Sequence, residues 1–149
     1  MKLNGLIAAT YTPFDENGNL NLSQVPKMVD HLVASKVDGL YVCGSTGEGV
    51  SLTSDERRAV AEAYLSAAKE SSEPAMPVVV QVGHNSLSEA EKLAEHAQAI
   101  GATAISANAP SYFKVTNVET LVSCMAKICL LYTSPSPRDA TLSRMPSSP

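Results

Sequence analysis

The sequence has no tryptophan, only three cysteines, and no apolar run long enough to cross a membrane. A membrane helix needs about 20 consecutive apolar residues, so no membrane partner is expected. The apolar run nearest the N-terminus, Leu6 to Ala9, is shorter than the roughly 7–15 apolar residues of a secretory signal. These absences predict a cytoplasmic protein.

The cysteines, Cys43, Cys124 and Cys129, form no CxxC pair and lack metal-ligand spacing. We therefore expect reduced, partly buried thiols, with no structural metal and no disulfide framework. Lysine and arginine are scattered along a chain of net charge -4, whereas binding a phosphate backbone requires them clustered. Nucleic acid is not an expected partner. A small anionic substrate is compatible with this charge, because a local anion site does not need a positive protein.

Residues 1–129 alternate between two kinds of apolar pattern. Short apolar runs predict buried strands within residues 6–11, 39–43, 77–82 and 103–107. Each run is followed by apolar residues at helical spacing, which predicts a helix with one inward face. The predicted inward residues are Val25, Met28, Val29, Leu32 and Val33, then Val60, Ala63, Tyr64 and Ala67, then Ala90, Leu93, Ala94 and Ala97, and finally Val118, Leu121, Val122 and Met125.

Polar residues mark where these helices begin and end. The predicted N-terminal caps are Ser23, Thr53 with Glu56, Ser86 with Glu89, and Thr116 with Glu119, and the third helix is predicted to stop at Gly101. Strand and helix thus alternate four times. Strands that are apolar throughout are typical of parallel sheets covered on both faces. An open doubly wound sheet and a closed (β/α)₈ barrel both fit this order.

The composition changes near residue 130. Residues 130–149 are dominated by serine and proline and carry no helix or strand period. We interpret 1–129 as one domain and 130–149 as a disordered tail. Because the change falls inside a helical pattern, we also interpret the tail as non-native sequence, such as a translated vector read joined to a broken transcript.

The segment with most chemical content is Gly44-Ser45-Thr46-Gly47-Glu48, directly after the second predicted strand. Parallel α/β proteins build ligand sites where strands end and loops begin. Two hydroxyls and the N–H groups of a glycine-containing loop can cradle a carboxylate. The alternative is a simple glycine turn into the next helix.

Two other strand ends add context to this motif. The first ends in Thr10-Tyr11-Thr12-Pro13-Phe14-Asp15 and the fourth in Ala109-Pro110-Ser111-Tyr112. In order and spacing, the three motifs resemble those of the dihydrodipicolinate synthase and N-acetylneuraminate lyase family. Segments 82–89 and 47–52 are most similar to the animal N-acetylneuraminate lyase branch. The resemblance covers about residues 3 to 129, the N-terminal half of a family member.

The resemblance implies a (β/α)₈ TIM barrel, truncated here to about the first four βα units. It also implies a class I aldolase, a lyase of carbohydrate metabolism. Such an enzyme forms a Schiff base with a keto sugar acid, here sialic acid, and cleaves it to N-acetylmannosamine and pyruvate without a cofactor or metal. Ser45 and Thr46 match the hydroxyls that hold the substrate carboxylate, and Ser45 also matches a member of a proton relay. Tyr112 matches a tyrosine that reaches into a neighbouring subunit's site, in a parent expected to be a homotetramer.

Two parts of the family's machinery fall on later strands. The Schiff-base lysine stands on the sixth strand and the main tyrosine follows the fifth, so neither is in this chain. Lys127 lies on a predicted helix and Lys114 in a predicted loop, where an ordinary ammonium is a poor nucleophile. We therefore expect the isolated chain to be inactive. The unpaired edges of its first and fourth strands should make it aggregate or pair with another copy.

Other residues have simpler interpretations. His84 is expected to make a loop hydrogen bond, and His31 and His96 to lie on the surface. Tyr41 and Cys43 should belong to the core. Glu48 should brace its loop, and Ser111 replaces an aromatic residue common in the family.

The same residues are compatible with other functions. The parent could be a dihydrodipicolinate synthase or another keto-acid aldolase of the same family. The chain could instead be a non-catalytic truncated binding module. A nucleotide-binding open sheet is disfavoured, because no predicted strand precedes GxGxxG or GxxxxGK[ST].

Overall fold

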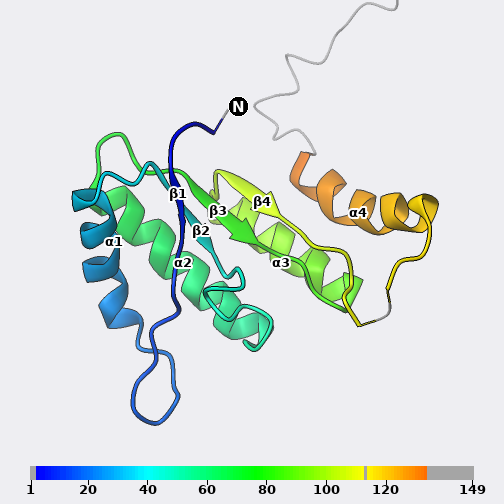
Figure 1. Ribbon diagram of the computed structural model, residues 1–149, viewed down its shortest axis with the longest axis horizontal. Coiled ribbons are helices and arrows are strands. Elements are labelled where there is room, and N and C mark those ends of the chain that lie inside the picture. The colour runs from blue at the N-terminus through cyan, green and yellow to red at the C-terminus, as the bar shows by residue number, and fades with distance from the viewer. Residues whose placement is uncertain (1–2, 113, 134–149) are drawn as a thin grey trace, which may run out of the picture.

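A computed structural model describes residues 3–112 and 114–133. Over this range strand and helix alternate, as the sequence predicts (Figure 1). The strands are β1 (Ile7–Ala9), β2 (Gly39–Val42), β3 (Val78–Gln81) and β4 (Ala104–Ser106). The helices are the 3-10 turn η1 (Leu22–Gln24), α1 (Val25–Ala34), α2 (Ser54–Ser71), α3 (Leu87–Ala99) and α4 (Val118–Thr133).

The described strands form one parallel sheet in the order β1-β2-β3-β4. Ala9 pairs with Tyr41, Tyr41 with Val79, and Val79 with Ala104. Each strand therefore lies beside the next one along the chain, and all their carboxyl ends meet at the same edge. Within the described part of the chain, β1 and β4 each have a neighbour on one side only, as the half-barrel interpretation predicts.

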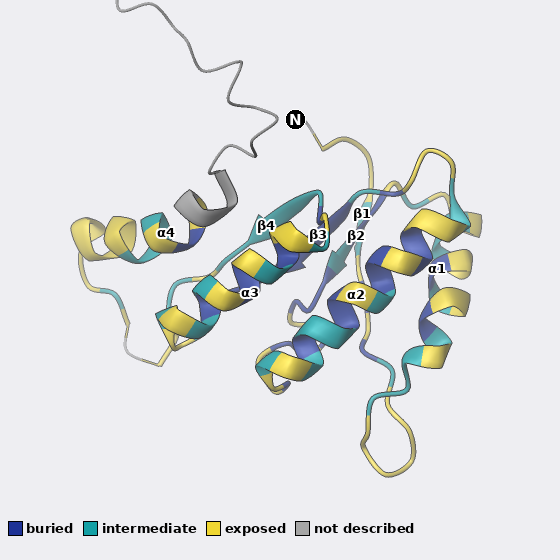
Figure 2. Cartoon of the chain, turned by 180° about the vertical axis from the view of Figure 1, so that it is seen from behind, coloured by how far each residue is buried: buried dark blue, intermediate teal, exposed yellow. Residues whose placement is uncertain are grey.

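Helices α1, α2 and α3 lie on one face of this sheet, as the opposite views of Figures 1 and 2 show. The strand residues beneath them, such as Leu40 and Val42, are fully buried. On the opposite face Tyr41 and Ser106 are only half-buried. Their partners on β3, Val79 and Gln81, are buried. The expectation of cover on both faces is therefore confirmed for β3 and wrong for Tyr41 and Ser106. In a closed barrel that second cover is the opposite wall, which later strands provide.

The core lies between the sheet and the three helices. Val25 and Val29 of α1 and Val60 of α2 are fully buried, as their spacing predicts. Tyr64 is also fully buried, and its hydroxyl donates a 2.6 Å hydrogen bond to the carbonyl oxygen of Tyr11. This bond links α2 to the chain just beyond β1, where the candidate site lies.

Several of the predicted helix boundaries are confirmed. Thr53 and Glu56 form a reciprocal capping box at the start of α2. The Ser86 hydroxyl accepts a hydrogen bond from the backbone N–H of Glu89 at the start of α3. Gly101 has φ +84° just after α3, a conformation that glycine adopts without strain.

Two predicted caps are wrong by one or two positions. Ser23 lies inside η1, where its hydroxyl donates to Asn21, and α1 begins after Gln24 with no side-chain cap. At α4 the cap is Asn117, whose Oδ1 accepts from the N–H of Thr120 at 2.8 Å, and not Thr116. Neighbouring polar residues compete for a cap, and only the one directly before the first turn reaches its N–H groups.

The predicted inward face of α4 is confirmed at Met125, which packs against the core, and is wrong for the first turns. Val118, Leu121 and Val122 are 69%, 38% and 59% exposed. The helix instead buries Ile128 and packs through its later turns on α3. No following βα unit lies within the described residues to cover the first turns. Helix α4 also runs to Thr133, past the predicted domain end at 129, while residues 134–149 lie outside the described range.

Candidate functional site at the carboxyl ends of the strands

The segment 44–49 follows β2 at the edge of the sheet where the strands end. Its backbone folds back on itself: the N–H of Gly49 donates to the oxygen of Gly44, and that of Glu48 to the oxygen of Ser45, both at 3.1 Å. A β-carbon on Gly49 would lie 1.9 Å from the carbonyl oxygen of Cys43. Only glycine fits this approach, and the turn holds Ser45 and Thr46 at its exposed tip.

Two non-glycine residues of this segment have left-handed backbones, with φ +59° at Cys43 and +54° at Glu48. Such conformations are strained and persist where surrounding contacts fix them. The N–H of Ser51 donates to the oxygen of Glu48 at 2.8 Å. Glu48 therefore shapes the loop through its backbone, at the point where the chain turns toward α2.

The chain after β1 anchors this loop. The Thr12 hydroxyl, which is buried, donates a 2.6 Å hydrogen bond to the carbonyl oxygen of Gly47. A β-carbon on Gly47 would lie 2.9 Å from the oxygen of Thr10. The Ser45–Thr46 tip is thus held from below by a second strand end, and the family-like motifs after β1 and β2 are in direct contact.

Arg57 of α2 is buried beneath the same loop, with 3% of its surface exposed. Its Nη1 donates to the oxygen of Gly83 at 3.0 Å, and its Nη2 to the backbone oxygen and Oε1 of Gln81 at 2.6 and 3.0 Å. Among the described residues its buried Nε has no hydrogen-bond partner, and no ion pair includes it. Burial lowers the pKa of Arg57, but an arginine side chain keeps its charge in proteins. The site therefore has a fixed positive charge held by neutral oxygens.

Sequence reasoning missed Arg57, although a signal was present. It stands three residues before Val60 and seven before Tyr64, on the buried face of α2. A charged residue in register with an apolar stripe is a candidate for a buried, specific role.

Cys43 lies between this arginine and the loop and is buried, as predicted. Its thiol is 3.7 Å from the carbonyl oxygen of Arg57. Burial raises the pKa of Cys43 to about 11, against the smaller opposing effect of the Arg57 charge. The thiol is therefore neutral and a weak nucleophile at neutral pH. Tyr41, also predicted to be core, is only half-buried, and its hydroxyl donates to the Ser106 hydroxyl at 3.0 Å on the open face of the sheet.

Two adjoining cavities open beside the loop. One of about 70 Å³ is lined by Tyr41, Cys43, Gly44 and Ser45 among others, and one of about 140 Å³ extends toward Asn85 and Ser111. Both share a wall made of Val50, Arg57, Gln81, Gly83 and Asn108. Since a cavity of about 10–15 Å³ holds one water molecule, the first cavity has room for a carboxylate-sized group.

The site residues expected from the sequence do not all come together. Ser45 lines the 70 Å³ cavity, and Thr46 is the exposed residue beside it. Tyr112 is on the β4–α4 loop, is 80% exposed, and lines neither cavity. The backbone N–H of Tyr112 and that of Ser111 both donate to the side chain of Asn85. Asn85 is a second residue that sequence reasoning missed, because the contact joins two loops far apart along the chain.

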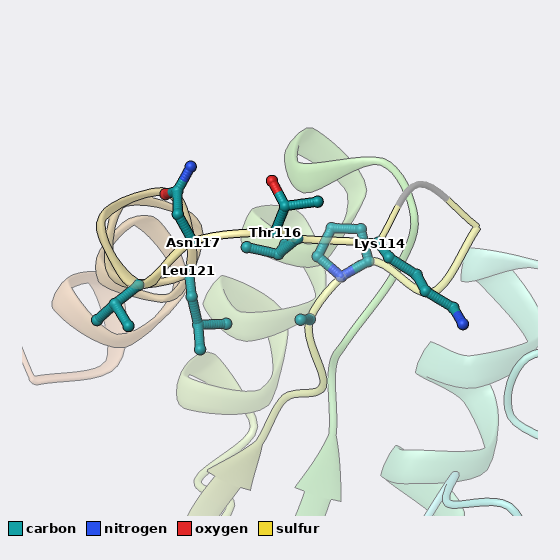
Figure 3. Close-up of a pocket in the computed structure, with 8 residues that line it drawn as sticks. Lys114, Thr116, Asn117 and Leu121 are labelled. Atoms are coloured by element: carbon teal, nitrogen blue, oxygen red, sulfur yellow. The ribbon is translucent and has the colours of Figure 1, made fainter.

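Lys114 and Lys127, the lysines nearest to a possible nucleophile role, are both exposed. Lys114 borders an open, largely apolar hollow of about 510 Å³ near the start of α4, together with Pro110 and Leu121. Figure 3 shows its ammonium group directed away from Leu121. Neither Ser45 nor Arg57 lines this hollow, but Ala109 lines both the hollow and the 140 Å³ cavity.

The histidines follow their expected roles with one correction. The Nδ1 of His84 accepts a 2.9 Å hydrogen bond from the N–H of Ser86, which is a loop contact as predicted. His31 is exposed. His96 is half-buried rather than on the surface, and its Nε2 lies 2.8 Å from the Glu62 carboxylate. Across the described residues no group of histidine, cysteine and acidic side chains is arranged to hold a metal ion, and no helix is long and apolar enough to span a membrane. Cys43 and Cys124 are free thiols.

Comparison with known proteins matches residues 2–133 to the Dihydrodipicolinate synthetase family. The chain is 43% identical to N-acetylneuraminate lyase of Gallus gallus and 41% identical to that of Homo sapiens, each over 128 residues. The structure resembles N-acetylneuraminate lyase of Aliivibrio salmonicida with a TM-score of 0.83 and 38% identity, over 90% of this chain and 43% of that chain. The Proteus mirabilis N-acetylneuraminate lyase gives the same TM-score, at 34% identity and over 90% of this chain and 44% of that one.

The match of the family model and the strand-end geometry agree, and the chain belongs to the dihydrodipicolinate synthetase family. Its sheet and helices correspond to the first βα units of the family's TIM barrel. The two sequence alignments include 85% of this chain. They include only 41% of the Gallus gallus relative and 39% of the human one. It therefore spans about two fifths of the length of the curated relatives it matches.

Proposed function

We propose that the full-length protein containing these residues is a class I aldolase that cleaves N-acetylneuraminate to N-acetylmannosamine and pyruvate. The relatives named N-acetylneuraminate lyase support the substrate class. The single observation in the chain that carries the proposal is the Ser45 hydroxyl at a carboxylate-sized cavity whose wall includes the buried Arg57 cation. A fixed positive charge held by neutral oxygens favours an anion there.

In this proposal Ser45 and Thr46 hold the substrate carboxylate, and a lysine on a later strand supplies the amine. The amine condenses with the keto carbon and water leaves. The resulting iminium accepts the electron pair when the bond between the α and β carbons breaks, while the proton of the β-hydroxyl passes to a base. The enamine then takes up a proton at its α carbon, and water hydrolyses the imine to release pyruvate.

The 149-residue chain by itself is proposed to be inactive, because the lysine and the principal tyrosine expected from the family belong to later strands. The full-length protein is proposed to act in the cytoplasm as a homotetramer, with Tyr112 contributing to a neighbouring subunit's site. No metal or organic cofactor takes part in the proposed reaction.

The experiment is a pyruvate-release assay on the full-length protein with N-acetylneuraminate as substrate. Borohydride reduction in the presence of pyruvate should trap a covalent adduct on one lysine, which peptide mass spectrometry can locate. Release of pyruvate without an adduct would contradict the Schiff-base mechanism. An adduct without cleavage of N-acetylneuraminate would instead indicate another keto-acid aldolase of the family.

A further inference from the structure

The side chain of Asn85 links two loops at the carboxyl edge of the sheet. Its Oδ1 accepts hydrogen bonds from the N–H of Ser111 at 2.9 Å, the N–H of Tyr112 at 3.2 Å and the hydroxyl of Ser111 at 3.4 Å. Asn85 lies just beyond β3, and the donors lie just beyond β4, 26 and 27 residues later. One oxygen therefore accepts hydrogen bonds from three donors on two consecutive residues.

The loop that receives this contact has little other regular support. Between the end of β4 at Ser106 and the start of α4 at Val118, the described residues form neither helix nor strand. Backbone N–H groups in such a segment need partners outside regular secondary structure. Asn85 provides an acceptor for two successive N–H groups at the position that determines where the Tyr112 side chain emerges.

Asn85 is itself held from both sides. Two residues earlier, the oxygen of Gly83 accepts from the buried Arg57, and a β-carbon on Gly83 would lie 2.8 Å from the N atom of Asn108. One residue later, Ser86 donates its N–H to His84. Arg57, beneath the Ser45 loop, is thus hydrogen-bonded to Gly83, and Asn85, two residues further along the chain, is hydrogen-bonded to the Tyr112 loop.

We propose that Asn85 is a positioning residue that fixes the β4–α4 loop so that Tyr112 is presented in the geometry the reaction requires. This inference rests on the proposed aldolase function and adds to it a residue that acts through Tyr112. The Asn85 side chain lines the larger of the two adjoining cavities, and in this proposal it acts through Tyr112. It joins the loop beyond β3, which Arg57 holds, to the loop that carries the tyrosine.

The test compares variants of the full-length protein that differ in one property of residue 85. Asn85→Leu has a similar size and no acceptor, whereas Asn85→Asp keeps oxygens that accept both N–H groups. Asn85→Leu should speed amide hydrogen exchange at residues 111–112 at least about tenfold. It should also lower kcat about 10- to 100-fold, because small misplacements of reacting groups have effects of this size. Pyruvate affinity should change less than about twofold. Asp should restore slow exchange and most of kcat, and Ser111→Ala, which removes one long bond, should have a small effect.

A double-mutant cycle separates positioning from general stability. If Asn85 acts through Tyr112, Asn85→Leu should lower kcat little further in a Tyr112→Phe background. An equal loss of kcat in both backgrounds, or unchanged exchange at residues 111–112 in Asn85→Leu, would overturn the proposal. The exchange measurement needs no substrate, so the two hypotheses can fail separately. If the aldolase assignment is wrong, the wild-type protein will release no pyruvate even though exchange at residues 111–112 is slow.

Discussion

The hydroxyl of Thr12 donates a 2.6 Å hydrogen bond to the carbonyl oxygen of Gly47, 35 residues later in the chain. The bond is buried, and it joins the segment after β1 to the loop that carries Ser45 and Thr46. Replacing Thr12 by valine keeps the shape and leaves that carbonyl oxygen without its partner. We expect a loss of about 1–3 kcal/mol in the free energy of unfolding together with weaker pyruvate binding. Urea unfolding and calorimetric titration of the full-length protein measure both, and Thr12→Ser, which keeps the hydroxyl, should behave like the wild type.

Ser45 offers a direct test of the carboxylate cradle. Removing its hydroxyl in Ser45→Ala should weaken pyruvate binding by about 10- to 150-fold, since one hydrogen bond to a charged group is worth about 1.5–3 kcal/mol. Ser51→Ala is the matched control, because Ser51 is exposed in the same connection and lies outside the cavity lining. Equal pyruvate affinity in Ser45→Ala and wild type would remove Ser45 from the site.

Replacing Arg57 should lower stability much more than replacing its neighbour Arg58. Arg57→Met removes the buried donors to Gln81 and Gly83 and should lower the free energy of unfolding by about 2–4 kcal/mol. Arg58 is partly exposed and pairs with the exposed Asp55 on the helix surface. Arg58→Met should change stability by less than about 1 kcal/mol. Chemical denaturation of the two variants decides this, and similar losses would argue against a special role for Arg57.

Stability should fall at high pH because of two buried groups. Burial raises the pKa of Cys43 from 9.0 to about 11 and that of Tyr64 from 10.0 to about 12. The folded state then retains these protons to higher pH than the unfolded state does. Their contribution to stability is complete below about pH 9 and is lost as the pH rises toward 11 and 12. Urea midpoints between pH 8 and 12 should decline, and Cys43→Ser should remove the earlier part of the decline. A midpoint independent of pH would contradict the burial of both groups.

The isolated chain of 149 residues should associate. The β1 and β4 edges each lack a second neighbour among the described strands, and Val118 and Val122 of α4 are exposed. Open edges and clustered apolar side chains favour contact with another chain. Light scattering should detect dimers or larger species, and serine at positions 118 and 122 should reduce them. A soluble monomer with a cooperative melting transition would contradict this expectation.

Local patterns predicted the elements well because each depends on residues close in sequence. The spacing of Val60, Tyr64 and Ala67 was sufficient to place the buried face of α2, and the Thr53–Glu56 capping box lies within a single helical turn. Such features require no knowledge of the rest of the molecule.

The errors and omissions depend on distant partners. The apolar spacing of α4 is real, but which face is buried depends on its neighbours, and within the described residues α4 packs mainly on α3. Arg57 is charged and would ordinarily be exposed, and the oxygens of Gln81 and Gly83 that accept its hydrogen bonds explain its burial. The role of Asn85 depends on the β3 and β4 strand ends lying side by side, which the sequence alone does not show.

The sequential order of the strands has a consequence for synthesis. Because β2 pairs with β1, β3 with β2, and β4 with β3, each of the strands β2 to β4 leaves the ribosome after the strand with which it first pairs. At about 5–20 residues per second, these units emerge over roughly 7 to 27 seconds. The wall of the barrel can therefore grow outward one strand at a time, with its open edge always facing the chain still to come.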